Sequence, residues 1–124
     1  MAIIYTETSS EYVAIVKCAG QLENTLQSDR EIAHHLHSEK FISKEVYEDV
    51  INARSTLTAI AKAGELVSGI RRKVEMNTQC YEDLMDYFYQ HGKKYADIIN
   101  SLDEAYEIAA SEISDLGSSR QQSP

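Results

Sequence analysis

Proline is almost absent from this chain, and its absence restricts what the chain can fold into. The 124 residues include one proline, at the last position, and five glycines. Sandwiches and barrels need many tight turns, which these two residue types usually mark. We therefore expect long helices joined by short polar links. A chain of this length fits one domain, and its 43% of apolar residues can fill a single core.

Six segments carry apolar residues at three- and four-residue steps, a spacing that predicts helices with one buried face. In the first segment, the apolar stripe runs from Tyr12 to Leu26 and includes Gly20, which weakens a helix and favours a kink there. The fourth segment spans residues 57–74, and the sixth ends near Leu116. Six such helices with short links predict an all-α, six-helix antiparallel bundle.

Polar residues mark where these helices begin. Residues 8–11 (TSSE) and 28–31 (SDRE) fit capping boxes, in which a hydroxyl and a carboxylate satisfy the first free amides of a helix. Ser43 is expected to cap the third helix. The predicted parts of the chain are an N-terminal arm over residues 1–9, a six-helix domain over residues 10–116 and a disordered polar tail over residues 117–124.

The net charge of −8 argues against nucleic acid as a partner, because an acidic surface repels phosphates. The longest basic run, Arg71-Arg72-Lys73, is short for a nucleic-acid patch. Cys18 and Cys80 fall on apolar stripes without CxxC spacing, so we expect buried free thiols and a cytoplasmic location. No signal peptide or membrane-spanning apolar stretch is evident in the sequence, and no membrane partner is expected.

Three histidines in four positions, His34, His35 and His37, raise the question of a metal site. Zinc needs four protein ligands, or three and a water molecule. The sequence has no HExxH spacing and no cysteine near these histidines, and a helix would point His35 away from the other two. We therefore expect a solvent-facing histidine cluster, with no metal and no cofactor.

Catalytic motifs are also missing from the sequence. It has no GxSxG element, no glycine-rich phosphate loop and no Cys–His pair in a recognisable setting. We therefore expect that the protein is not an enzyme. A metal-binding protein or an enzyme built on a helical bundle remains the alternative, and bound metal in the purified protein would separate the two interpretations.

Two stretches, IAHHLHSEKFISKEVYEDVINARSTLTAIAKAGELV and CYEDLMDYFYQHGKKYADIINSL, carry a family pattern. In this pattern the second helix carries a leucine and is followed by an apolar corner and a serine that caps the third helix. The fourth helix has a threonine followed by Lys-Ala and a pair of apolar residues. The fifth helix begins with an aromatic–acid–x–apolar sequence. The matching residues are Leu36, Phe41-Ile42, Ser43, Thr58, Lys62-Ala63, Leu66-Val67, Tyr81-Glu82-Asp83-Leu84 and Phe88. Over residues 12–106 the chain thus resembles a caspase recruitment domain, one branch of the death-fold superfamily. It departs from that family in having Lys40 where the corner usually has glycine, a longer fourth helix and an extended sixth helix.

The resemblance implies a death fold of Greek-key type and a function in homotypic binding. One such domain recognises another, or a second copy of itself, and acts as an adaptor that assembles an apoptotic or innate-immune signalling complex. If the family's packing holds, an acidic and a basic patch lie on opposite faces and give a head-to-tail contact that can grow into a filament.

The residues expected at these contacts fall into three groups. The acidic patch comprises Glu39, Glu45, Glu48 and Asp49; the basic patch comprises Lys17, Lys62, Arg71, Arg72 and Lys73; and Tyr87 and Tyr89 are candidate aromatic contacts. A further open alternative is that the chain is the interaction domain of a larger multidomain protein.

Overall fold

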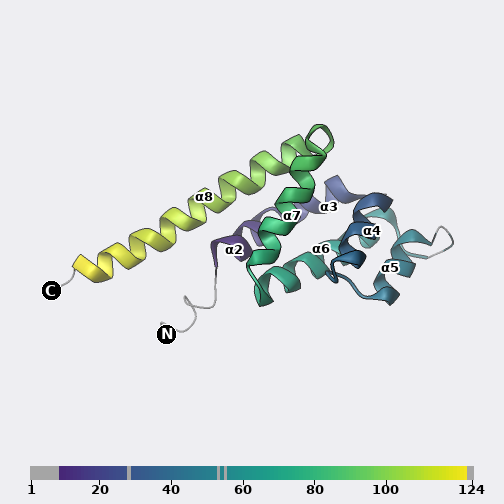
Figure 1. The fold of residues 1–124 in the computed structure, drawn as a ribbon, viewed down its shortest axis with the longest axis horizontal. Coiled ribbons are helices and arrows are strands. Elements are labelled where there is room, and N and C mark those ends of the chain that lie inside the picture. The colour runs from purple at the N-terminus through teal and green to yellow at the C-terminus, as the bar shows by residue number, and fades with distance from the viewer. Residues whose placement is uncertain (1–8, 28, 53, 55, 123–124) are drawn as a thin grey trace.

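The computed structural model describes residues 9–27, 29–52, 54 and 56–122, with side chains through residue 112 (Figure 1). These residues form seven helices and no strand, which confirms the all-α class. The helices are α2 (Ser10–Lys17), α3 (Ala19–Leu26), α4 (Arg30–Ser38), α5 (Lys44–Ile51), α6 (Ala59–Met76), α7 (Gln79–Gln90) and α8 (Gly92–Gln122). None of these described helices is long and apolar enough to cross a membrane.

The helices pack as one bundle. Helix α2 lies against α8 and α6, α3 lies mainly against α6, and α7 lies against α8. Helices α4 and α5 pack on each other and on α6. The largest fully buried side chains come from every helix except α5: Ile15, Leu22, Leu26, Ile32, Leu36, Leu66, Ile70, Leu84, Phe88, Tyr95, Ile98 and Leu102.

The first predicted helix is in fact two helices, so the predicted number of six is wrong. Helices α2 and α3 meet at Cys18, where φ is −96° and ψ is 8°. The predicted kink is therefore present, but it lies two residues before Gly20, which is inside α3 with open space around a Cβ placed on it. The break lets α2 pack on α8 while α3 turns towards α6, with Cys18 and Leu22 buried.

Side-chain oxygens cap several helix starts. Ser9 caps α2 and Asp29 caps α4, each accepting a hydrogen bond from the backbone N–H three residues on, at 3.0 and 3.2 Å. Thr8 and Ser28, which the sequence predicts for these roles, lie outside the described residues. Ser43 caps α5 as predicted, through the N–H of the third residue on at 3.2 Å.

The turn between α4 and α5 is built around a residue in the left-handed conformation. Lys40 has a φ of 64°, the only positive φ among the described non-glycine residues. Its amide donates to the His37 carbonyl at 3.1 Å, and the amide of Phe41 donates to the Leu36 carbonyl at 2.8 Å. This is the Schellman arrangement, which usually has glycine at the left-handed position. The corner then packs on Gly69 of α6, where an added Cβ would lie 2.6 Å from the Phe41 oxygen.

One helix runs further than the sequence predicts. Helix α6 ends at Met76, in line with the expected longer fourth helix, but α8 ends at Gln122, beyond the predicted end near Leu116. Helix α8 therefore continues through residues 117–122, where the sequence predicts a disordered tail. Extending an existing helix needs no new nucleation, so polar residues can add turns beyond the packed part. In Figure 1, α8 projects well past the other helices.

Both cysteines are buried free thiols, as predicted. Burial raises the pKa of Cys18 and the pKa of Cys80 above the usual thiol value. Both side chains are therefore neutral packing groups at neutral pH and poor nucleophiles.

Candidate interaction surfaces

The three clustered histidines contact tyrosines. Tyr47 of α5 forms a hydrogen bond with His34, and its ring stacks on His37 with centroids 4.5 Å apart and planes at 9°. His35 points the other way and stacks on Tyr87 of α7 at 4.1 Å. Of the three histidines, only His34 is exposed, so the cluster is less solvent-facing than the sequence predicts. The described residues contain no group of three or more metal-ligating side chains.

A buried carboxylate links the start of α4 to the start of α8. One oxygen of Asp29 accepts the cap hydrogen bond from Ile32 and lies 3.0 Å from Nζ of Lys94. The other oxygen accepts a hydrogen bond from the Tyr95 hydroxyl. Burial raises the pKa of Tyr95, and this bond raises it further, so the hydroxyl remains a donor at neutral pH. Tyr95 itself departs from helical geometry, with φ of −114° and ψ of 16°.

Three of the four predicted acidic residues lie together. Glu45, Glu48 and Asp49 are exposed on α5, and their spacing places them on one face of the helix. Glu39 is exposed at the end of α4, apart from that face. Burial raises the pKa of Cys80 on α7, and the negative charge of Glu39 raises it slightly further. The acidic surface is therefore the outer face of α5 without Glu39.

The five predicted basic residues do not form one patch. Consecutive residues of a helix are about 100° apart around its axis, so Arg71, Arg72 and Lys73 point in three directions. Arg71 and Arg72 are exposed, whereas Lys73 is half-buried. Lys17 is exposed on α2, where its charge acts on the neighbouring Cys18.

Lys62 has a structural contact of its own. Its Nζ donates a hydrogen bond to the backbone oxygen of Asn52, at 2.9 Å. Asn52 is the C-cap of α5, where carbonyl groups lack partners within the helix. Lys62 therefore holds the end of α5 against the start of α6 and is less available to a partner than Arg71 or Arg72.

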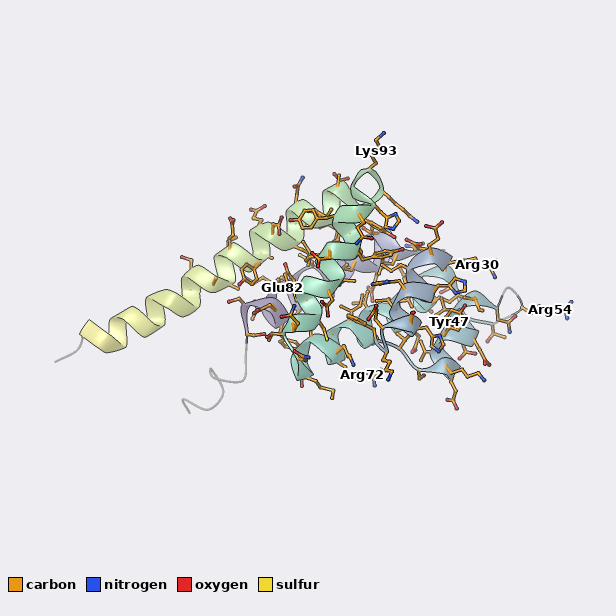
Figure 2. All side chains as sticks on the ribbon, viewed as in Figure 1. Arg30, Tyr47, Arg54, Arg72, Glu82 and Lys93 are labelled. Carbon is orange, nitrogen blue, oxygen red and sulfur yellow. The ribbon has the colours of Figure 1, made fainter. Side chains whose placement is uncertain are left out.

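A surface depression of about 620 Å³ separates the α4–α5 corner from α6. Its charged lining is mostly basic, with Lys40, Arg72 and Lys73 against one acid, Glu65. Figure 2 shows Arg72 projecting at the edge of the bundle near α6. The first turn of α5 also lines this depression. Arg72 and Lys73 therefore border α5, whereas the family resemblance implies acidic and basic patches on opposite faces.

The two candidate tyrosines differ in their availability. Tyr87 is half-buried between helices, with its ring on His35. Tyr89 is 55% exposed, and its hydroxyl donates to Asp103 of α8 at 2.8 Å. Tyr89 also lines a smaller depression of about 320 Å³, whose charged groups are all acidic, among them Glu82 of α7. Only Tyr89 is placed to contact a partner.

Three features of these surfaces are absent from the sequence prediction. They are the buried network around Asp29, the basic depression and the acidic depression. The only local sequence signal for the network around Asp29 is the capping pattern at residues 28–31. This pattern does not show that the distant Tyr95 binds the same carboxylate. Both depressions combine residues from helices that are distant in sequence.

Comparisons with known proteins found no relative of this chain. No protein-family model matches the chain, and no match was found among curated proteins or among solved structures.

Proposed function

We propose that this chain is a protein–protein interaction domain that binds domains of its own kind. The observation that carries the proposal is the distribution of exposed charge. The outer face of α5 is acidic and exposed, and Arg71 and Arg72 are exposed on α6. Among the described residues, the only ion pair that involves either predicted patch is Lys44–Glu48, at 3.8 Å. These charges therefore have few partners within the molecule and are available to another one.

The resemblance to caspase recruitment domains supports the choice of partner. It implies a death fold with Greek-key order, and it implies a second such domain as the partner in an apoptotic or innate-immune assembly in the cytoplasm. Contact between unlike surfaces is heterologous, so each added copy leaves a free surface of each kind, and the assembly can extend as a filament. The charges would set specificity and encounter rate more than affinity.

Charge reversal tests the proposal. We expect Glu48→Lys/Asp49→Lys to abolish self-association, measured by sedimentation velocity over a range of concentrations, and Arg71→Glu/Arg72→Glu to do the same. Both variants should stay folded, because exposed substitutions usually change stability by only about 0.5 kcal/mol. A mixture of the two variants should form pairs through the two intact surfaces, and the variant with all four changes should associate again.

The matched control is Glu31→Lys/Asp83→Lys, which replaces an exposed acid of α4 and one of α7 that line neither depression and belong to neither patch. It should associate like the parent. If the α5 and α6 variants also associate like the parent, the charged faces are only solvated surface and the proposed mechanism is wrong.

A further inference from the structure

The basic depression beside α6 has the composition of a protein docking site. Phe41 and Ile42 form its buried apolar floor, and Lys40 and Arg72 are exposed at its rim. Met76 lines it with 83% of its surface exposed, the highest value among the large apolar side chains described. Neither rim residue forms an ion pair within the described part of the chain. An apolar floor with a basic rim fits a segment that is acidic and carries an exposed apolar side chain.

Helix α8 carries such a segment. Glu104, Glu107, Ile108 and Glu112 are exposed and follow one another at steps of three, one and four residues, which places them on one side of the helix. Ile108 is 44% exposed within this group, which we call the acidic ridge. The ridge is helical and already ordered, so binding it would cost little conformational entropy.

We propose that the basic depression of one copy receives the acidic ridge of α8 from a second copy. The inference rests on the proposed function, since it assumes self-association, but it names a different acidic surface from the face of α5. Three carboxylates of the ridge meet Lys40, Arg72 and Lys73, and Ile108 packs against the apolar floor and Met76. No residue of α8 lines the depression of its own molecule, so the contact joins two copies.

The net charge of −8 does not prevent this contact. Two acidic copies repel each other at long range, but charges are screened beyond about 8 Å at physiological ionic strength. The pairs across the depression lie well within that distance, and they are opposite in sign. A pair keeps a free ridge on one copy and a free depression on the other, so further copies can add at both ends.

Sedimentation velocity at physiological ionic strength tests the inference with two reversals. Glu107→Lys/Glu112→Lys changes the ridge, and Lys40→Glu/Arg72→Glu changes the rim. Each should weaken self-association by about tenfold or more, because like charges then face each other at the contact. A mixture of the two variants should form pairs, since one keeps its depression and the other keeps its ridge. The variant with all four changes should associate again.

Two further variants make the result specific. Ile108→Asn removes the apolar contact without adding charge and should also weaken association, whereas the control Glu31→Lys/Asp83→Lys should not. Circular dichroism establishes that each variant is folded. If the ridge variant associates like the parent while the α5 and rim variants do not, this inference is wrong and the proposed function stands. If no variant differs from the parent, both are wrong.

Discussion

The chain turns between α4 and α5 and again between α7 and α8, and the two turns are held by different means. The first is held by backbone hydrogen bonds around Lys40 and by close packing on Gly69. The second also has backbone hydrogen bonds, at His91, but side chains tie it to a distant helix, because Lys94 and Tyr95 both bind the buried carboxylate of Asp29. A turn of the first kind depends on a few consecutive residues, whereas one of the second kind depends on a residue 66 positions away.

Removing the carboxylate should have the largest effect. We expect Asp29→Ala to lower the free energy of unfolding by about 3 kcal/mol, since it removes a helix cap worth about 1 kcal/mol and leaves a buried hydroxyl without its acceptor at a cost of about 1–3 kcal/mol. Urea denaturation measures the loss. Tyr95→Phe is the control, because it removes only the hydroxyl and keeps the cap, and its loss should be smaller. A loss below about 1 kcal/mol for Asp29→Ala would mean that the second turn does not depend on this network.

Filling the space at Gly69 should break the first turn. The Cβ of Gly69→Ala would lie 2.5 Å from Ile42 Cγ2 and 2.6 Å from the Phe41 oxygen, so the corner must move. We expect a loss of about 1–3 kcal/mol in thermal or urea unfolding, typical of overpacked sites. Gly64→Ala, in the same helix, meets only a Glu23 carboxylate oxygen at 3.4 Å and should stabilise the protein by up to about 1 kcal/mol. Equal effects at the two glycines would contradict the packing argument.

The left-handed residue offers a smaller gain. The left-handed conformation costs a residue with a side chain about 1–2 kcal/mol, and glycine avoids this cost. Glycine also makes the unfolded chain more flexible, which lowers the stability of the folded state by about 0.4–1 kcal/mol. Lys40→Gly should therefore raise the free energy of unfolding by roughly 0.5–1 kcal/mol. Lys40→Ala keeps a Cβ and should bring no such gain, which separates backbone strain from the loss of a charge.

The smallest effect is a pH dependence at His35 of α4. Burial lowers the pKa of His35, and His91 lowers it further, while Glu39 and Asp83 oppose the shift. The unfolded chain then takes up the proton first, near its ordinary pKa of about 6.5, and stability falls as the pH drops below that value. Unfolding midpoints between about pH 5 and pH 8 should fall less in His35→Gln than in the parent. Parallel curves for the two proteins would contradict the shift.

The sequence was sufficient where structure depends on neighbouring residues. The apolar stripes predict the helices, and Ser43 is recognisable as a cap because its partner is three residues away. The sequence predicts a kink at Gly20, because helix propensity shows where a helix is weak. The break lies instead at Cys18, because packing on α6 and α8 decides where the helix bends.

The surfaces were harder to predict than the helices. Arg71, Arg72 and Lys73 are adjacent in sequence and read as one patch, yet a helix separates them around its axis. Glu39 is close to Glu45 in sequence, but it ends α4, and the turn at Lys40 separates it from α5. Lys62 has the right charge, but its ammonium group is engaged with Asn52. In each case the residue type was informative, and the direction of the side chain required the fold.

The bond between Asp29 and Tyr95 also has a consequence for synthesis on the ribosome. Asp29 emerges early, and its first oxygen can cap α4 at once through the nearby Ile32 amide. Its second oxygen must wait for 66 further residues before the Tyr95 hydroxyl arrives. Until then α4 can form only while the second Asp29 oxygen stays hydrated, so the region around Asp29 stays exposed to water. The early helices therefore close around their polar centre only once the first residues of α8 have emerged, after the other described helices of the bundle.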